Sequence, residues 1–181
     1  MSSLEYTAYI ITRETLKTMA RKGVFVGIGS DTLRGISEEA IIGRFRPKVQ
    51  PERGSGQRET NYPLPGIHIT WMGHNRPESA GEVDYDDGII TMLIQTIDSL
   101  DSTEDNNIES YMRWQTDIRE WLQVNPYRDL SPRLGEIYFV HVTESTAPEH
   151  QPFLMDEARL VLTVKLFTRS RRDSGVRNYD T

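Results

Sequence analysis

The segment from Ile89 to Ile97 restricts the fold more than any other part of this sequence. Successive residues of a strand point to opposite faces, and here both faces are apolar. One face carries Ile90, Met92 and Ile94, and the other carries Ile89, Leu93 and Ile97. We therefore expect residues 83–100 to form a central strand, or a strand whose second face is covered by another element.

Three further segments have the composition or alternation of strands. Residues 66–72 (GIHITWM) and 136–145 (EIYFVHVTES) are rich in β-branched and aromatic residues. Residues 157–168 alternate most regularly, with Ala158, Leu160, Leu162, Val164 and Leu166 on one face and Arg159, Thr163 and Lys165 on the other. A short apolar run at residues 24–28 is expected to be a buried strand or the remnant of one.

Two segments have helical periodicity. Residues 108–123 place Ile108, Tyr111, Met112, Ile118 and Leu122 on one face, with Asp105 or Asn106 as the N-cap. Residues 4–22 open with a helix that is clearest after Thr12, which we interpret as an N-cap, and Gly23 is expected to cap its C-terminus. Residues 37–45 (SEEAIIGRF) predict a shorter third helix.

These elements predict one α+β domain over residues 1–170. Short loops join neighbouring strands, so we expect a mostly antiparallel sheet of at least four strands with two helices packed on one face. Residues 46–64 hold prolines, glycines and many charges, and we predict a long loop there that orders on docking. Residues 171–181 are expected to form a flexible tail, and the chain is expected to be exposed and mobile from Arg169 onward.

The composition argues against several classes of protein. The net charge is −6, whereas a general nucleic-acid binder needs a basic surface. The absence of cysteine excludes disulfides and cysteine metal sites. No apolar run is long enough for a signal peptide or a membrane span, so we expect a soluble protein without a membrane partner.

No motif for bond-making chemistry emerges from the sequence. Gly27-Ile28-Gly29 follows an apolar run, but Thr32 stands where a dinucleotide fingerprint needs a third small residue. Asp84, Asp86 and Asp87 resemble hard-cation ligands, yet their spacing does not fit a calcium loop, and an acidic turn is the simpler interpretation. None of His68, His74, His141 and His150 has metal-ligand spacing, and at His68 and His141 we expect solvent-facing or hydrogen-bonded strand positions. We therefore expect no enzyme, no cofactor and no bound metal.

Basic residues are the candidate contacts with a partner or with another copy of the chain. They cluster in the segment that leads into the long loop, within that loop, and near the C-terminus. The candidates are Arg44, Arg46, Lys48, Arg53, Arg58, Arg171 and Arg172. The plainer interpretation is that they are solvated loop and tail charges in an acidic protein.

The chain resembles the tail terminator and the related neck or tail-completion proteins of tailed bacteriophages. The likeness rests on residues 65–69 (PGIHI), 86–88 (DDG) before the long strand, 111–119 (YMRWQTDIR) and 158–164 (ARLVLTV). It covers residues 13–23 and 65–168 as a pattern of elements. The insertion between Gly23 and Pro65 is longer than expected for the simplest members, which leaves the position within the neck open.

The resemblance implies a structural subunit that closes into a ring, commonly of six. Such a ring ends the tail tube, with or without a sheath, and joins it to the head connector, while DNA passes through the lumen without specific binding. It implies a virion protein made in the host cytoplasm, with no catalytic residue and no obligatory cofactor. A head-completion or stopper protein of the same neck is the alternative. Two other classes remain open: a metal-dependent enzyme using Asp84–Asp87 acids, and a nucleic-acid-binding module using Arg169, Arg171 and Arg172.

Overall fold

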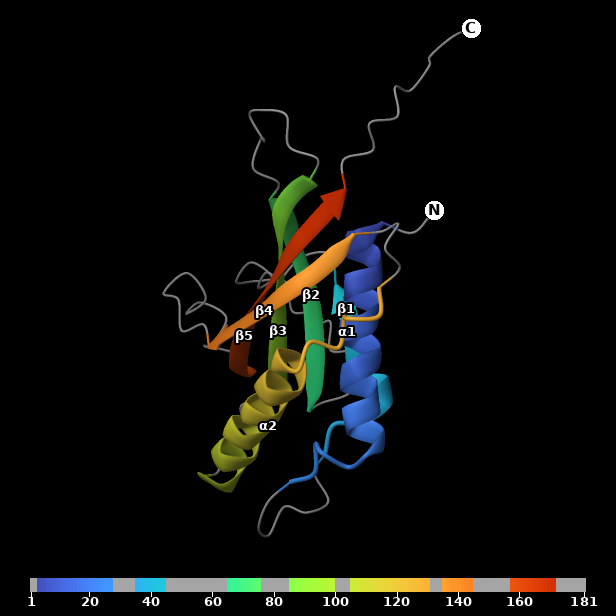
Figure 1. Ribbon diagram of the computed structural model, residues 1–181. Coiled ribbons are helices and arrows are strands. Elements are labelled where there is room, and N and C mark those ends of the chain that lie inside the picture. Colours follow the sequence, from blue (N-terminus) through green and yellow to red (C-terminus); the bar gives the residue numbers. More distant parts are fainter. Residues whose placement is uncertain are drawn as a thin grey trace, which may run out of the picture.

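The computed structural model describes residues 3–27, 35–44, 65–75, 85–99, 105–130, 135–144 and 157–171. Within these residues the chain forms two α-helices, one short 3-10 helix and five strands (Figure 1). In chain order they are α1 (Leu4–Arg21), η2 (Glu38–Ala40), β1 (Ile41–Arg44), β2 (Gly66–Asn75), β3 (Tyr85–Ser99), α2 (Asp105–Gln123), β4 (Glu136–Glu144) and β5 (Glu157–Arg171). The predicted loop at residues 46–64 lies outside the described residues.

The five strands form one sheet in the order β1-β2-β3-β5-β4. β1 runs parallel to β2, and every other neighbouring pair is antiparallel. The α+β class and the mostly antiparallel sheet predicted from the sequence are confirmed. β3 is the third strand of five, and it pairs with β5 along its whole length, from Tyr85 opposite Arg171 to Ser99 opposite Glu157. Its central position accounts for the apolar residues on both of its faces.

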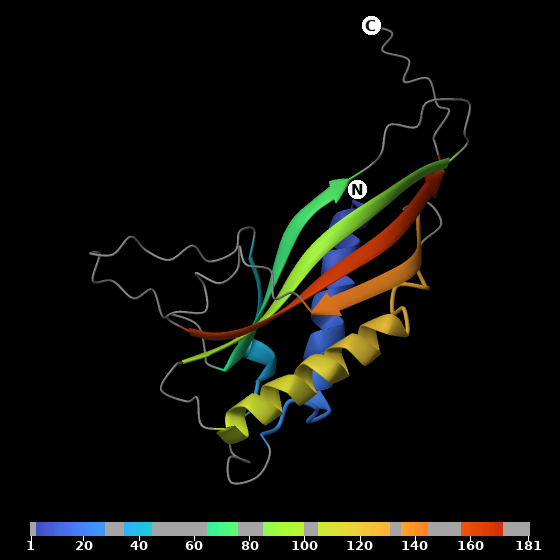
Figure 2. The same ribbon diagram turned by 90° about the vertical axis from the view of Figure 1, so that its left-hand side faces the viewer.

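The main core lies between one face of the sheet and the two α-helices. Cross-strand partners share a face, so Ile69, Ile94 and Leu162 form one row across β2, β3 and β5. This row belongs to the same buried cluster as Leu16 of α1 and Ile118 of α2. Figure 2 shows α1 and α2 on the same side of the sheet. We call this side the helix face.

The opposite face of the sheet is also buried at its centre. His68 pairs with Gln95, and Thr70 pairs with Leu93; all four side chains are at most 3% exposed. Of the two alternatives predicted for His68, solvent-facing or hydrogen-bonded, the solvent-facing one is wrong, because its side chain is fully buried. His141, on the edge strand β4, is exposed as expected.

The first helix begins earlier than its predicted cap. Ser3 is the N-cap, and its hydroxyl accepts a hydrogen bond from the Tyr6 amide. Thr12 is buried in the middle of α1, where its hydroxyl donates to the Ala8 carbonyl, so the prediction of Thr12 as the cap is wrong. Thr12 lies inside the helix, on the side that contacts the core. Gly23 ends the helix with a positive φ of 72°, which confirms the predicted C-terminal glycine.

The segment after α1 contains less helix and less strand than its sequence predicts. Within residues 24–27 the only strand-like pairing is a single bridge from Val26 to Gly35, so the described part of this segment holds a remnant of a strand. The helix predicted at residues 37–45 is reduced to the single turn of η2, and the chain then becomes β1. Pairing of Ile41 with Ile67 on β2 outweighs local helical preference in this short segment.

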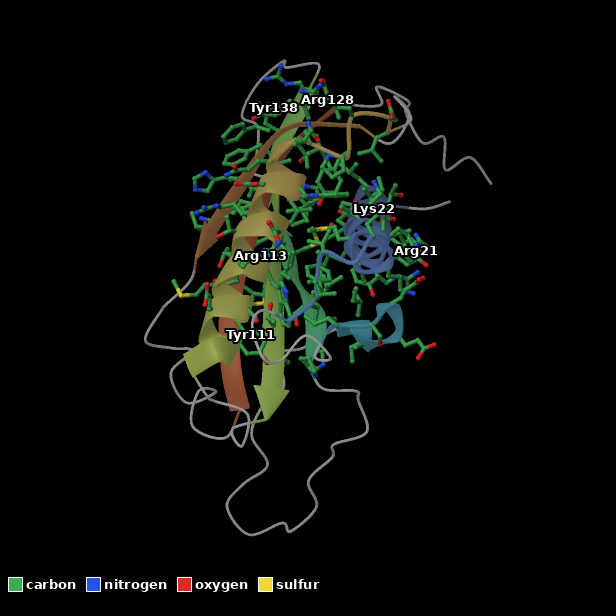
Figure 3. The ribbon with its side chains drawn as sticks, turned by 90° about the horizontal axis from the view of Figure 1, so that it is seen from below. Arg21, Lys22, Tyr111, Arg113, Arg128 and Tyr138 are labelled. Carbon is green, nitrogen blue, oxygen red and sulfur yellow. The ribbon has the colours of Figure 1, made fainter. Side chains whose placement is uncertain are left out.

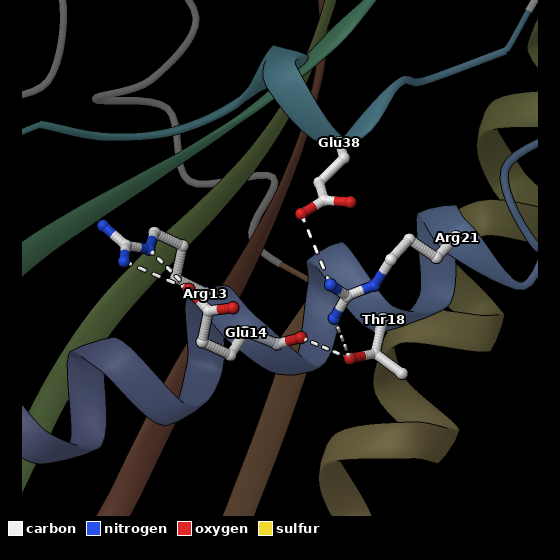
Figure 4. A network of polar contacts seen from close by, with 5 residues as sticks. All are labelled: Arg13, Glu14, Thr18, Arg21 and Glu38. Atoms are coloured by element: carbon white, nitrogen blue, oxygen red, sulfur yellow. Dashed lines mark hydrogen bonds and ion pairs between the residues drawn. The ribbon is translucent and has the colours of Figure 1, made fainter.

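Polar contacts on the surface join α1 to η2 (Figure 4). Arg21 Nη2 donates to Thr18 Oγ1 at 3.0 Å, and Arg21 Nη1 lies 3.5 Å from Glu38 Oε1. On the same helix, Arg13 Nη2 lies 3.0 Å from Glu14 Oε1. These side chains are one-third to one-half exposed, so each pair contributes little to stability, and the Arg21–Glu38 pair mainly defines where η2 lies.

Two predicted details of α2 are wrong. Asp105 is the first residue of the helix and Asn106 the second, so neither is the residue before it. Met112 is 61% exposed, whereas Trp114 is 1% exposed and fills the core. Met112 lies one residue after the buried Tyr111, and a step of one residue rotates by about 100° around a helix of 3.6 residues per turn.

The C-terminal strand continues beyond its predicted end. β5 reaches Arg171, and its residues Arg169 and Arg171 pair with Asp87 and Tyr85 of β3. The prediction of a mobile tail from Arg169 is therefore wrong for residues 169–171, because β3 extends far enough to pair with them. Residues 172–181 lie outside the described residues.

Candidate subunit interface

The two predicted basic contacts that the structure describes, Arg44 and Arg171, are not brought together by the fold. Arg44 ends β1 opposite Thr70, which in turn pairs with Leu93 of β3. Arg171 ends β5 opposite Tyr85, eight residues before Leu93 along β3 (93 − 85 = 8). The two arginines are thus separated both along the strands and across the sheet. The other candidates, Arg46, Lys48, Arg53, Arg58 and Arg172, lie outside the described residues.

The edge strand β4 exposes aromatic side chains. A bulge between Ile137 and Phe139 interrupts its pairing with β5, and Tyr138 and Phe139 are 47% and 51% exposed. The ring centroids of Phe139 and Phe167 lie 5.5 Å apart, and those of Tyr138 and Phe167 lie 6.4 Å apart. Figure 3 shows Tyr138 well separated from Arg21 and Lys22 at the end of α1. We call Tyr138, Phe139 and Phe167 the aromatic edge.

Arg169 borders the aromatic edge and is held there by two contacts. Its guanidinium donates to both carboxylate oxygens of Asp87, at 2.9 and 3.3 Å, and lies 5.4 Å from the centre of the Tyr138 ring. The hydrogen bond from Arg169 lowers the pKa of Asp87, and the same bond raises the pKa of Arg169. Asp87 therefore balances the charge of Arg169, one of the arginines that the sequence suggested for contact with a nucleic-acid phosphate.

A second exposed apolar patch lies at the other side of the sheet. Trp71 and Met72 of β2 are 40% and 48% exposed and follow the last residue paired with β1. Tyr6 of α1 is 59% exposed. Residues on either side of Tyr6 contact the sheet: Glu5 contacts His74 of β2, and the Tyr9 side chain lies over Gly43 of β1.

Because Gly43 pairs with Ile69, these contacts place the first two turns of α1, which carry Tyr6, beside the part of β2 between Ile69 and His74. That part contains Trp71 and Met72. We call Tyr6, Trp71 and Met72 the β2 corner. The aromatic edge and the β2 corner lie on opposite borders of the described sheet, and their side chains differ in kind and arrangement.

A buried polar chain on the helix face has the order of a hydrolase triad. Glu5 Oε1 lies 2.6 Å from His74 Nδ1, and His74 Nε2 lies 3.2 Å from Thr168 Oγ1. Burial alone would raise the pKa of Glu5, but hydrogen bonds from His74, from its own amide and from Ser3 lower it from 4.5 to about 2. Thr168 is only 2% exposed, so its hydroxyl is not presented to a substrate. The arrangement fits a structural link better than a nucleophile.

The rival metal site receives no support from the described residues. Asp87 is engaged by Arg169, while Asp84 and the side chain of Asp86 lie outside what the structure describes. Across the described ranges, no group of three or more histidine, aspartate or glutamate side chains is arranged to hold a metal ion. In the same ranges, no helix is long and apolar enough to cross a membrane.

Sequence reasoning missed both apolar patches and the His74 contacts. At the aromatic edge a signal was present: adjacent Tyr138 and Phe139 interrupt the alternation of β4, which marks a bulge with both rings outward. The contact between Glu5 and His74 leaves no local trace, because the two residues meet only through the packing of α1 on β2. Comparison with known proteins adds no assignment: no family model matches the chain, and no curated protein matches it.

Proposed function

We propose that this chain is a ring-forming structural subunit of a tailed-phage neck, and that it acts as the tail terminator. In this role it caps the tail tube and joins it to the head connector. The proposal combines the sequence resemblance with the distribution of exposed apolar side chains on the fold. A head-completion subunit of the same neck would use the same kind of ring and differs in its neighbours.

The carrying observation is the pair of unlike patches on opposite borders of the sheet. A closed ring is built from heterologous contacts, in which one surface of each subunit meets a different surface of the next. The aromatic edge offers Tyr138 and Phe139 beside Arg169, a composition that is enriched in protein interfaces. The β2 corner offers Trp71 and Met72 as the second surface.

The charge of the protein suits a ring through which DNA passes. With a net charge of −6, the chain lacks the overall positive charge that would hold phosphates by counterion release. Arg169 of the C-terminal basic cluster forms an ion pair with Asp87. Weak attraction to DNA favours passage through a lumen over binding.

The test is assembly, first of the chain alone and then with its proposed neighbours. Mass photometry and negative-stain images of the purified chain are expected to give closed rings of one stoichiometry. Added to tail tubes, the rings are expected at one tube end, and tubes grown in their presence should stop lengthening. A monomer under all these conditions, including addition of the head connector, would refute the proposal. Rings that bind the connector but not the tube would identify the head-completion alternative.

A further inference from the structure

Each border of the described sheet exposes a length of strand without a neighbour. β4 pairs with β5 on one side, and no described strand lies on its other side. β1 covers β2 only from Ile67 to Thr70, so among the described residues no strand borders residues 71–75 of β2. Such edges present main-chain N–H and C=O groups that can add another strand.

The exposed side chains at these borders are not of the kinds that prevent one sheet edge from pairing with another. Proteins commonly protect an edge with lysine, proline or a bulge. Both borders do carry a bulge, between Trp71 and Gly73 on β2 and between Ile137 and Phe139 on β4. However, the residues exposed at the bulges are aromatic or thioether side chains, which favour contact with another protein surface.

We propose that β4 of one copy pairs with residues 71–75 of β2 in the next copy, so that the sheet continues from subunit to subunit around the ring. This inference rests on the proposed function, and it adds which strands form the contact. The occupant of each edge is a second copy of the same chain.

Strand directions support this pairing. β2 is antiparallel to β3, β3 to β5, and β5 to β4, so β4 and β2 of one copy run in opposite directions. Neighbouring copies in a ring are related by a rotation, which preserves handedness. A neighbour that continues the sheet with the same face towards the inside of the ring therefore also has the same strand directions. β4 then meets β2 of the next copy as an antiparallel pair, the slightly more stable arrangement.

The exposed apolar side chains supply part of the area that such a contact needs. Five side chains of the two patches are 40–59% exposed: Tyr6, Trp71, Met72, Tyr138 and Phe139. Large side chains of this kind bury about 200 Å² each when fully covered, so together they offer roughly 500 Å² of apolar surface. A small stable interface buries about 1,200 Å² in total, of which about 700 Å² is non-polar. Strand pairing over about 17 Å and its flanking side chains would supply the remainder.

A two-fold pairing of β4 with β4 of a second copy is the competing arrangement. It would cover the aromatic edge and leave Trp71 and Met72 exposed in the dimer. The head-to-tail pairing uses both borders, so each patch lies beside a neighbouring copy, the aromatic edge on the face opposite the helices and Trp71 on the helix face. The two arrangements therefore differ in whether the β2 corner matters for assembly.

The test uses three lysine substitutions at residues of similar exposure. Phe139→Lys alters the aromatic edge, Met72→Lys alters the β2 corner, and Met112→Lys on α2 is the matched control, at 51%, 48% and 61% exposure. Circular dichroism and thermal unfolding would verify that each variant is folded. By mass photometry, we expect Met112→Lys to form wild-type rings, and the other two variants to be monomers.

Mixing the two interface variants gives the decisive result. Phe139→Lys retains an intact β2 corner, and Met72→Lys retains an intact β4, so a head-to-tail contact permits one junction. An equimolar mixture is expected to form a 1:1 dimer and nothing larger. Rings formed by Met72→Lys alone, or a mixture that stays monomeric, would overturn the strand pairing while leaving ring formation by the wild-type chain intact. A wild-type chain that never assembles would overturn both this inference and the proposed function.

Discussion

Glu5 and His74 stand 69 residues apart in the sequence, yet Glu5 Oε1 lies 2.6 Å from His74 Nδ1. The contact ties the first turn of α1 to the end of β2. With the carboxylate as acceptor, His74 Nδ1 donates to Glu5, and His74 Nε2 lies 3.2 Å from the Thr168 hydroxyl oxygen. One histidine thereby joins α1, β2 and β5 beside the β2 corner.

Replacing Glu5 by Gln should destabilise the fold. The substitution removes a charged acceptor from a largely buried histidine, and we expect the free energy of unfolding to fall by about 1–2 kcal/mol at pH 7. Urea unfolding measures the change. Glu14→Gln is the control on the same helix, since it breaks only the surface pair with Arg13 and should cost at most about 0.5 kcal/mol. Equal losses in the two variants would contradict the role of the Glu5–His74 pair.

The contribution of Glu5 should depend on pH in the acid range. The folded state lowers its pKa from 4.5 to about 2, so the stabilisation is present above pH 4.5 and is lost as the pH falls towards 2. The difference in unfolding free energy between wild type and Glu5→Gln should therefore shrink across this window. Urea titrations at pH 6, 4 and 2.5 test this, and a difference that stays constant would refute it.

Gly88 provides the space that the His74 ring occupies. A Cβ at this position would lie 2.6 Å from His74 Nε2 and 3.0 Å from Thr168 Oγ1. We expect Gly88→Ala to destabilise the protein by about 1–3 kcal/mol through overpacking. In a His74→Ala background the same substitution should cost clearly less, because the ring is gone. Additive losses in this double-mutant cycle would show that the strain at Gly88 has another source.

Tyr127 should stabilise the fold through its hydroxyl and make it sensitive to alkali. The side chain is 1% exposed, and its hydroxyl lies 2.7 Å from Thr12 Oγ1. Tyr127→Phe should lower stability by about 1 kcal/mol, as measured by urea unfolding near pH 7. Tyr138→Phe, at an exposed position, is the control and should have little effect there.

Burial raises the pKa of Tyr127 well above 10, which favours the neutral phenol in the folded state. The stability that it provides is therefore present below pH 10 and is lost as the pH rises beyond it. Unfolding measured between pH 9 and 11.5 should show a smaller decline for Tyr127→Phe than for wild type. Identical declines would exclude Tyr127 as a source of the alkaline sensitivity.

Trp114 should be among the most costly residues to truncate. It packs edge-on against Phe25 and Tyr111, and its indole donates to the Val26 carbonyl at 3.1 Å. Trp114→Ala should cost about 3–5 kcal/mol in urea unfolding, because it leaves a large cavity and an unpaired carbonyl. Met112→Ala, on the exposed side of the same helix, should change stability by no more than about 0.5 kcal/mol. Comparable effects would contradict the assigned orientation of α2.

Local pattern was sufficient for the long elements. The two-faced apolar run of β3, the alternation of β5 and the helical spacing of α2 each reflect a repeat that adjacent residues carry themselves. The short elements were predicted poorly. Residues 41–44 became β1 instead of a helix, because four residues gain more from pairing with β2 than local preference can oppose.

The sequence by itself determined which residues form the long strands and helices of the core, since burial of a periodic apolar face is a local property of the chain. Only the tertiary structure decided that β4 lies at a border, that Tyr138 and Phe139 are therefore uncovered, and that Glu5 reaches His74. These features depend on the order of strands in the sheet and on the packing of α1 over it. The border position of β4 and the Glu5–His74 contact join segments distant in the chain, and no spacing of neighbouring residues encodes these two features.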